Sequence, residues 1–437
     1  MNIILLSGGS GKRLWPLSND VRSKQFLKIF KDENGNYESM LQKMYRKINS
    51  IDSAANIVIA TAKNQVSSTI NQLGDSVDIS IEPCRKNTFP AIVLATLYLS
   101  DVKNISRDET VVVCPIDPYV DDNYFLSLKK LYDLEKESDK NLFLMGIDPT
   151  CPSEKYGYIM PETKDDVSSV KMFKEKPDEK TATDYIRQGA LWNGGVFAFK
   201  IGYLIDIAHK LIDFEDYYDL YDKYDTLEKI SFDMAVAEKE KNIGVMKFRG
   251  KWEDLGTWNT LTESLDDSII GKATLDKTSK NSNIINELNI PILGMGLNNI
   301  VVAASSDGIL VSDKEMSSKI KDYVEDIEEQ VMFAEKSWGT YRIINIEKES
   351  QTLLVTLNKG HSMKYHSHDN RNEVWTIISG TGKTIIDGME QDVKPGDVIT
   401  IDAGCKHTIK ALTTIKLVEV QIGKDISVKD KHVFELE

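Results

Sequence analysis

The chain has 437 residues, a length that predicts two or three domains at roughly 100–200 residues per domain. Hydrophobic residues make up 41% and charged residues 28% of it, the composition of a folded rather than a disordered protein. The 68 acidic and 54 basic residues give a net charge of −14. This balance excludes a general nucleic-acid-binding surface, which would need a basic patch, but it leaves room for a single nucleotide site.

No apolar run approaches the ~20 residues that span a bilayer. The opening run, residues 1–7, has no basic flank and stops at glycines, so it predicts a buried strand and not a signal peptide. The four cysteines are widely spaced without a C-x-x-C pair, which favours free thiols and a cytoplasmic protein without membrane partners.

The first ~265 residues alternate short apolar runs with longer helical patterns. Strands are expected at 3–6, 57–60, 111–114 and 142–146, with a helix around 91–99. This alternation is typical of an α/β domain with a mixed, mainly parallel sheet and helices on both faces. We therefore predict that residues 1–265 form the first domain.

The alternation of strand and helix patterns ends at about residue 265. Short β-branched pieces at 284–285, 300–303 and 309–311 predict a small β-helix-like connector, followed by a charged, helix-compatible linker over 317–335. We place this connector and linker at 266–330. From 331 to 437 strands recur without a long helix, which indicates an all-β barrel. The strands expected there are 352–357, 374–378, 384–386, 398–401 and 416–422.

A glycine-rich loop follows the first strand. Gly8, Gly9 and Gly11 allow the backbone to approach a ligand closely, and the carboxyl end of a first strand is where α/β sheets bind phosphates. Arg13 adds a fork of donors for phosphate oxygens. The loop matches neither the Walker A nor the Rossmann pattern, and taken alone it is equally compatible with a tight turn.

Seven longer motifs in order are far more specific. Together they resemble the sugar-nucleotide pyrophosphorylases, and the details of the first motif resemble the mannose-1-phosphate guanylyltransferase branch. The segments are 8–17 (GGSGKRLWPL) with 23–27 (SKQFL), 82–91 (EPCRKNTFPA), 115–117 (PID), 146–150 (GIDPT) with 156–159 (YGYI), 173–177 (FKEKP), 192–197 (WNGGVF) and 252–258 (WEDLGTW).

The resemblance implies a GT-A or Rossmann-like nucleotidyltransferase domain. In its reaction an oxygen of a sugar 1-phosphate attacks the α-phosphorus of GTP, and pyrophosphate leaves. Because the attacking group is already an anion, catalysis depends on positioning and charge stabilisation rather than on a strong base.

The resemblance also assigns roles. The three loop glycines are expected to hold the triphosphate, and Arg13 and Lys24 to neutralise it. Asp117 and Asp254 are expected to bind Mg²⁺. The remaining assignments are Glu82, Asn87 and Thr88 for the purine and ribose, and Gly157, Glu175, Lys176 and Asn193 for the sugar phosphate.

Three positions depart from the family pattern: Ser23 replaces a proline, Lys86 an arginine and Pro118 a histidine. Ser23 is expected to change only the local backbone stiffness, whereas Lys86 and Pro118 leave open a relative of mannose 1-phosphate. A pyrophosphorylase for another nucleotide or sugar is a separate alternative. A non-catalytic sugar-nucleotide sensor is a further alternative, but such a sensor would have no need of both Asp117 and Asp254.

Four of the six histidines lie within 361–407. Residues 360–380 fit G-x5-H-x-H-x4-E-x6-G, and residues 396–407 fit G-x7-G-x2-H, so this region resembles the cupins. Two histidines at i and i+2 on one strand share a face. His366, His368, Glu373 and His407 are therefore predicted to bind Zn²⁺ or another divalent transition metal.

A cupin behind such a transferase resembles the isomerase half of bifunctional mannose-6-phosphate isomerase/mannose-1-phosphate guanylyltransferases. The core departs from that family: Asp369 and Asn370 are extra residues, Val374 replaces a histidine, and the family's lysine near 353–355 is missing. A working isomerase, another sugar-related metal cupin, an oxygen-dependent enzyme and a structural barrel all remain open. We also expect a homodimer.

Overall fold

The computed structural model describes residues 1–9, 12–19, 21–324, 330–424, 426–427 and 429–436. The chain divides into two compact units. The first consists of Met1–Gly9, Gln25–Val66 and Ser76–Gly256, and the second of Ser10–Lys24, Ser67–Asp75 and Thr257–Glu437. The second unit thus includes a short segment taken from the motif-rich N-terminal region.

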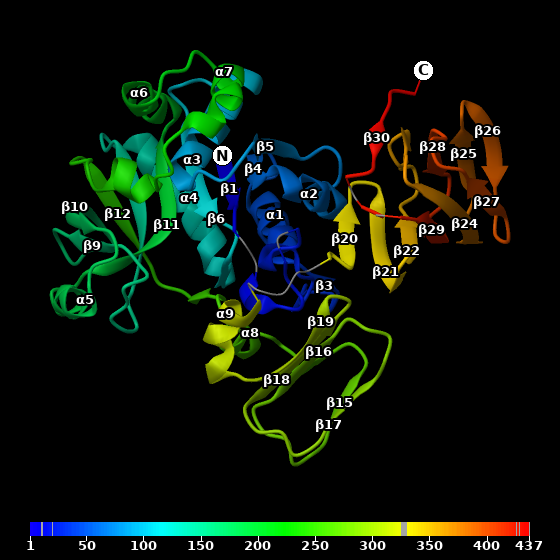
Figure 1. The fold of residues 1–437 in the computed structure, drawn as a ribbon. Helices are drawn as coiled ribbons and strands as arrows, with labels where there is room; N and C mark the ends of the chain where they lie inside the picture. Colours follow the sequence, from blue (N-terminus) through cyan, green and yellow to red (C-terminus); the bar gives the residue numbers. More distant parts are fainter. Residues whose placement is uncertain (10–11, 20, 325–329, 425, 428, 437) are drawn as a thin grey trace. The chain divides into compact units, whose positions relative to one another are not determined.

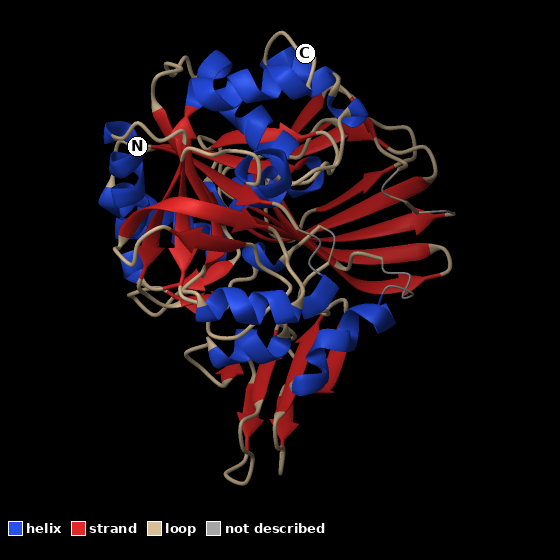
Figure 2. Cartoon of the chain, turned by 90° about the vertical axis from the view of Figure 1, so that its left-hand side faces the viewer, coloured by secondary structure: helices blue, strands red, loops and turns tan. Residues whose placement is uncertain are grey.

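A nine-stranded mixed sheet forms the centre of the first unit (Figures 1 and 2). Strands β5, β4, β1 and β6 are parallel, β11 runs antiparallel between β6 and β8, and β12 is parallel to β8. In spatial order the strands are β5 (Asp78–Glu82), β4 (Asn56–Ala62), β1 (Asn2–Ser7), β6 (Thr110–Pro115), β11 (Leu191–Lys200), β8 (Leu142–Ile147), β12 (Ile243–Phe248), β10 (Val167–Lys174) and β9 (Tyr158–Pro161).

Both faces of this sheet are covered. Ile3, Ile4 and Leu5 of β1 are all fully buried, and consecutive strand residues point to opposite faces. Helix α3 packs on β1, β4 and β5, and α4 packs on β6, β8 and β11. The helices of this unit are α1 (Met40–Ile51), α3 (Thr88–Leu97), α4 (Asp122–Glu137), α5 (Glu179–Arg187), α6 (Ile201–Leu211) and α7 (Tyr217–Asp222).

Two short antiparallel ribbons complete the first unit. Strand β2 (Phe30–Lys31) pairs with β3 (Tyr37–Glu38), and β7 (Pro118–Val120) pairs with β13 (Trp252–Asp254). The second ribbon joins segments more than 130 positions apart, just after β6 and just before the first unit ends.

The connector in the second unit has the predicted coiled form. Strands β14 (Ile269–Ile270), β16 (Asn283–Asn286) and β18 (Ile300–Ser305) stack in parallel, and β15 (Ala273–Leu275) stacks on β17 (Ile292–Gly294). An antiparallel strand, β19 (Gly308–Asp313), closes the stack. The short helices of this unit are α2 (Val66–Leu73), α8 (Trp258–Glu263) and α9 (Ile320–Val324).

The prediction of a helix-compatible linker over 317–335 is only partly correct. Helix α9 ends at Val324, and β20 (Phe333–Lys336) is already an edge strand of the next sheet. The charged residues of this segment did not predict a buried strand. Glu335 is nevertheless buried, because its carboxylate accepts a hydrogen bond from the Gln72 side chain (2.8 Å).

After Gln330 every regular element among the described residues is a strand (Figure 1). Two antiparallel sheets enclose a core that includes Trp375, Ile409 and Leu417. The six-stranded sheet is β20, β21 (Gly339–Glu347), β22 (Ser350–Leu357), β29 (Ile415–Gly423), β24 (Arg371–Ser379) and β27 (Val398–Ile401). The five-stranded sheet is β26 (Met389–Val393), β25 (Gly382–Ile386), β28 (His407–Ala411), β23 (His366–Ser367) and β30 (His432–Val433).

Candidate active site and candidate metal centre

The β7–β13 ribbon brings together the two aspartates that the motifs single out. Asp254 pairs with Pro118, so Asp117 lies one residue from the partner of Asp254. The two carboxylates also share a neighbour: burial first, then Asp254 and Asp117 among other groups, raises the pKa of Tyr156 to about 12. Two carboxylates placed together offer the oxygen ligands that a hard cation such as Mg²⁺ prefers, so these residues fit the implied metal.

Side chains of Glu175, Phe173 and Asn193 lie close around Gly157. A Cβ at this position would lie 2.7 Å from Oε2 of Glu175 and 3.0 Å from the Phe173 ring, so only glycine leaves the Glu175 carboxylate in place. The backbone N–H of Asn193 donates to the Gly157 carbonyl (2.8 Å). Three residues predicted for the sugar phosphate, Gly157, Glu175 and Asn193, are therefore neighbours.

Asp233 completes this group, although the motifs do not contain it. The Asn193 side-chain amide donates to Oδ1 of Asp233 (2.6 Å), and Oδ1 of Asn193 accepts from the Gly195 backbone (3.1 Å). Burial, together with the nearby Glu175 charge, raises the pKa of Asp233 to about 6. The Lys176 ammonium lies 2.6 Å from Oε1 of Glu175.

Aromatic rings lie next to these polar groups. The Tyr156 ring lies 4.6 Å from that of Trp192 and 5.6 Å from that of Trp252, centroid to centroid. Tyr156 thus contacts the strand that carries Asn193 and the strand that carries Asp254. Apolar ring faces beside carboxylates and amides suit a sugar, which presents C–H faces and hydroxyl groups together.

Glu82 ends β5 with its side chain buried. The Tyr224 hydroxyl donates to Oε2 of Glu82 (3.1 Å), and burial raises the pKa of Glu82 to about 7. Asn87 has a φ of 73° and caps α3, and the Thr88 hydroxyl accepts from the Phe232 backbone (2.9 Å). Their side chains therefore shape the loop that follows Glu82.

The glycine loop is held through its carbonyl groups. The Gly9 carbonyl accepts from the side chains of Gln65 and Arg85 (both 3.3 Å), and Gln25 donates to the Ser7 carbonyl (3.3 Å). Gly9 has a φ of 145°, and a Cβ on Gly8 or Gly9 would meet nothing within 4 Å. This open space fits a loop that a ligand approaches closely. Gly11 lies outside the described residues.

Arg13 and Lys24 belong to the second unit, where the connector holds their segment. The Arg22 guanidinium binds both carboxylate oxygens of Glu287 (2.8 and 2.9 Å), and the Asn19 amide donates to Asp307 (2.8 Å). The segment that carries the two predicted triphosphate-binding cations is thus fixed to β-connector residues far along the chain.

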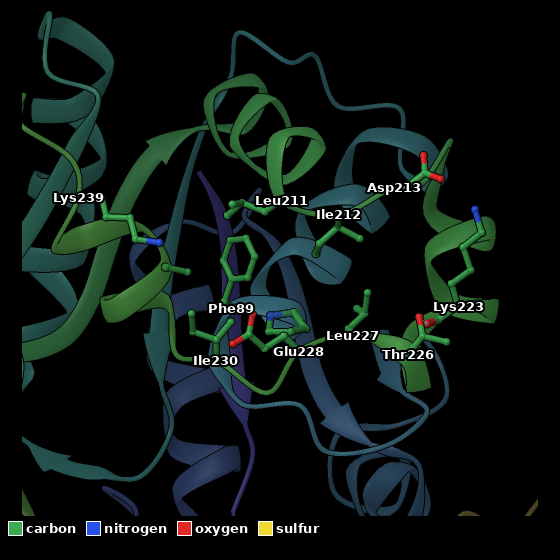
Figure 3. A pocket seen from close by; sticks show the side chains of 12 residues that line it. Phe89, Leu211, Ile212, Asp213, Lys223, Thr226, Leu227, Glu228, Ile230 and Lys239 are labelled. Carbon is green, nitrogen blue, oxygen red and sulfur yellow. Dashed lines mark hydrogen bonds between the residues drawn. The ribbon is translucent and has the colours of Figure 1, made fainter.

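A separate cavity of about 430 Å³ lies beside the first turn of α3. Apolar side chains, among them Phe89, Leu211 and Leu227, line its middle, and the charged groups of Asp213 and Lys223 lie toward one end (Figure 3). None of the predicted site residues lines this cavity.

The cupin histidines converge as predicted from their spacing. Nitrogen atoms of His366, His368 and His407 lie within 4.8 Å of one another. The Nδ1 atom of each faces a backbone carbonyl, that of Lys364 for His366 (2.6 Å), of Asp430 for His368 and of Cys405 for His407 (2.9 Å). These contacts orient the Nε2 atoms toward the centre, which is how proteins position metal-binding imidazoles.

Glu373 joins the histidines. Its carboxylate lies 3.2 Å from Nε2 of His368 and 3.4 Å from Nε2 of His407, and it accepts from Nε1 of Trp375 (3.1 Å). Nε2 of His407 is buried without a hydrogen-bond partner, which is costly unless a ligand is bound. Three imidazoles, a carboxylate and this orphaned nitrogen fit a divalent metal.

The surroundings favour the metal-binding forms of these side chains. Burial lowers the pKa of His366 to about 3 and that of His368 to about 4. Burial also opposes ionisation of Glu373, but its close contacts with His407 and Arg371 outweigh burial and lower the pKa of this carboxyl group. Neutral imidazoles and an ionised carboxylate are the forms that bind metals.

Comparison with known proteins places both sites in a family context. The nucleotidyl transferase family model matches residues 2–268, more than half of the chain. The chain belongs to the nucleotidyl transferase family. A second family model, the cupin domain, matches residues 353–420 of the same chain.

Several relatives are similar to this nucleotidyl transferase along nearly the whole length of both chains. It is 28% identical to a mannose-1-phosphate guanylyltransferase of Salmonella montevideo over 96% of this chain and 95% of the relative. It is 27% identical to the mannose-1-phosphate guanylyltransferase of Escherichia coli K12 over 98% and 96%. The xanthan biosynthesis protein XanB of Xanthomonas campestris (strain B100) is 28% identical over 99% and 97%.

A solved structure from Thermus thermophilus is similar to most of this nucleotidyl transferase. It is named a mannose-1-phosphate geranyltransferase, and it aligns with a TM-score of 0.62 and 26% identity over 74% of this chain and 98% of the other. The predicted combination of an α/β transferase fold with a C-terminal cupin is confirmed. No described helix is long and apolar enough to cross a membrane.

Sequence reasoning missed several residues of these sites in the nucleotidyl transferase. Asp233 and Tyr224 carry no motif and come from a helical region well separated from their partners. Arg371 could have been found, because it lies between His368 and Glu373. Its Nε donates to Glu373 (2.9 Å) and its Nη2 lies 2.9 Å from Nε2 of His368.

Proposed function

We propose that the chain synthesises GDP-mannose and pyrophosphate from GTP and mannose 1-phosphate, with Mg²⁺ as the metal. The observation that carries this proposal is the β7–β13 ribbon, which pairs the segment of Asp117 with that of Asp254 inside a nucleotidyl transferase fold. Full-length relatives named mannose-1-phosphate guanylyltransferase support the choice of both substrates.

The chain's own residues position the two anions. Gly8 and Gly9 let the triphosphate approach the backbone closely, while Arg13, Lys24 and Gly11 are assigned to the triphosphate by resemblance. Asp117 and Asp254 would hold Mg²⁺, which lowers the repulsion between the attacking sugar phosphate and the α-phosphate. Because the attacking oxygen is already ionised, these contacts replace a general base.

Different residues would recognise the guanine base and the sugar. Glu82, fixed by Tyr224, can accept hydrogen bonds from the N1–H and N2–H₂ edge of guanine, with Asn87 and Thr88 shaping the same loop. Glu175 and Asn193, supported by Asp233, bind sugar hydroxyl groups, and Lys176 meets the sugar phosphate. A buried carboxylate discriminates strongly, because the wrong base would leave it unpaired. A reaction that consumes GTP is expected in the cytoplasm.

The experiment is a matrix of four nucleoside triphosphates against mannose, glucose and fucose 1-phosphates, followed by pyrophosphate release with Mg²⁺ present. GTP with mannose 1-phosphate should exceed every other pair by at least about tenfold. A stronger signal from another pair would replace these substrates, and no release from any pair would refute the transferase proposal.

For the cupin we propose a second activity, the interconversion of mannose 6-phosphate and fructose 6-phosphate. The supporting observation is a cavity of about 550 Å³ that the metal-ligand candidates His366, His368 and Glu373 help to line. With His407 they would hold Zn²⁺ or a similar ion, which polarises the oxygens at C1 and C2. Fructose 6-phosphate formation should be lost in His366→Ala; a metal-loaded wild type that forms none would refute this activity.

We further propose that the chain is a homodimer. One row across the outer face of the six-stranded sheet is Leu354, Val418, Thr376 and Val398, and Leu354 and Val398 are 45% and 61% exposed. An apolar row on a flat face is suited to pairing with its own copy. Light scattering should give twice the chain mass, and Leu354→Glu should halve it; a monomeric wild type would contradict the proposal.

A further inference from the structure

The cupin cavity carries an excess of positive charge. It is lined by three cations, Arg371, Lys336 and Lys431, and by two acidic residues, the metal-ligand candidate Glu373 and Glu419. Cations therefore outnumber carboxylates even when both acids are ionised, and a divalent metal would add to the excess. Such a cavity favours an anionic ligand over a neutral one.

The three cations differ in how many hydrogen bonds and ion pairs they already make with the protein. The Arg371 guanidinium is committed to Glu373, to Nε2 of His368 and to the Ser427 carbonyl (3.1 Å). The Lys336 ammonium lies 5.5 Å from the centre of the Tyr341 ring. Among the described residues neither Lys336 nor Lys431 takes part in an ion pair, so both retain donors for a ligand.

The two lysines lie close enough to repel each other. Lys431 is exposed as a whole residue, but its amine lies at the cavity, where burial lowers its pKa to about 8. Lys336 and Arg371 lower the pKa further, while Glu373 and Glu419 raise it. Burial likewise lowers the pKa of Lys336. A bound dianion would relieve this repulsion.

The C-terminal segment that delivers Lys431 is fixed on both sides of it. The carboxylate of Asp430 accepts from the backbone amides of Asp369 (2.9 Å) and Asn370 (3.1 Å), and the His368 ring faces its carbonyl. On the other side, the Phe434 amide donates to the Tyr365 carbonyl (2.9 Å). The two extra residues after His368 therefore form the anchor of the segment.

The rest of the cavity suits the carbon skeleton of a sugar. Trp338, Tyr341 and Leu353 line it together with other apolar side chains, and aromatic faces of this kind pack on the C–H groups of sugars. Its volume of about 550 Å³ lies within the range of small-molecule sites, about 300–1,000 Å³.

We propose that the cupin cavity binds a sugar phosphomonoester, with Lys336 and Lys431 holding its phosphate group and the Asp369–Asn370 expansion anchoring Lys431 for that purpose. The proposal rests on the cupin activity given above only for the identity of the sugar. The phosphate subsite itself is a property of the cavity and does not depend on turnover.

Titration calorimetry on the full-length protein, with and without Zn²⁺, tests the subsite with mannose 6-phosphate, mannose and inorganic phosphate. Mannose 6-phosphate should bind in both states and inorganic phosphate more weakly, whereas mannose should not bind measurably. Lys431→Met and Lys336→Met should each weaken mannose 6-phosphate binding about tenfold or more, the usual effect of losing one charge-assisted hydrogen bond. Lys429→Met, an exposed neighbour in the same segment, should change nothing.

Hydrogen exchange locates the bound ligand, because the transferase unit also has phosphate-binding residues. Mannose 6-phosphate should protect backbone amides in residues 430–436 of the wild type and not of Lys431→Met. Unchanged affinity in both lysine variants, or protection confined to residues 1–265, would overturn the subsite. If binding behaves as expected but no fructose 6-phosphate forms, the isomerase proposal fails while the subsite stands.

Discussion

Glu82 is a buried carboxyl group and Asp233 a half-buried one, and the surroundings of both raise the pKa above the ordinary value. Each is held by one donor, the Tyr224 hydroxyl for Glu82 and the Asn193 amide for Asp233. Their pKa values, about 7 and about 6, are raised chiefly by burial. Perturbed carboxyl groups of this kind are common at binding sites, and they make the protein's stability depend on pH.

The pH dependence of stability tests the environment of Glu82. Its pKa is higher in the folded protein than the ordinary 4.5, so its contribution to stability is complete below pH 4.5 and is lost as the pH rises through about 7. The loss amounts to at most about 3 kcal/mol. Glu82→Gln stays neutral, so its unfolding midpoint should rise relative to wild type between pH 5 and pH 8. A pH-independent difference would contradict the assigned burial.

Gly157→Ala tests the residues that we propose bind the sugar. The added methyl group would meet Oε2 of Glu175 at 2.7 Å, so the carboxylate must move. The KM for mannose 1-phosphate should rise about tenfold or more, while the KM for GTP stays within about twofold. Gly8→Ala is the matched comparison: a Cβ there has open space, and its effect should fall on GTP instead. Equal effects of Gly157→Ala on both substrates would argue against the assignment.

At the level of elements, the connector acts as an anchor for the segment Ser10–Lys24. Besides the Arg22–Glu287 pair, the Pro16 carbonyl accepts from the Ser305 hydroxyl (2.7 Å), and the Trp15 carbonyl accepts from Nε1 of Trp258 (3.2 Å). The β-helix-like connector therefore holds the segment that carries Arg13 and Lys24, the two cations that we propose bind the triphosphate.

Breaking the Arg22–Glu287 pair should be costly. Glu287→Ala leaves a buried guanidinium without its partner, and such losses destabilise proteins by about 3–5 kcal/mol. The KM for GTP should rise as well, because the segment loosens. Glu390→Gln removes an exposed pair with Lys383 in the same unit and should cost less than about 1 kcal/mol. Urea unfolding and steady-state kinetics measure both effects; similar costs for the two variants would contradict the anchoring role.

Much of this architecture was predictable from patterns. Continuous apolar runs identified β1, β4, β6 and β8, and the turn-separated β-branched runs identified most cupin strands. Strand order was not predictable, because β11 enters between β6 and β8 through long-range pairing. Strand β20 was hidden by its charged residues, one of which, Glu335, is buried beside Gln72.

The residues of the candidate sites likewise include some that the sequence predicts and others that only the structure shows. His366, His368, Glu373 and His407 follow from spacing, since alternate strand residues share a face. Asp233 and Lys431 do not, because nothing local links Asp233 to Asn193 or Lys431 to Lys336. The Asp369–Asn370 expansion is a departure in the sequence, and only the structure shows that it binds Asp430.

At the scale of the whole molecule, the two units contain different chemistries. In the first, His209 is the sole histidine, and the candidate site is built from carboxylates, amides and glycines, as suits Mg²⁺ and phosphates. The second contains the histidine cluster with its cationic cavity. Consecutive reactions on one sugar phosphate, isomerisation and then nucleotidyl transfer after the phosphate has moved to C1, would explain why one chain carries both.

The most direct measurement is pyrophosphate release from GTP and mannose 1-phosphate with Mg²⁺ by wild type, Asp117→Asn, Asp254→Asn and Glu253→Gln. Glu253 neighbours Asp254 in β13 and points to the other side of the ribbon. We predict turnover by wild type and Glu253→Gln, and a loss of about a thousandfold in both aspartate variants with unchanged unfolding midpoints. Turnover by the folded aspartate variants at the wild-type rate, or none by wild type, would contradict the account.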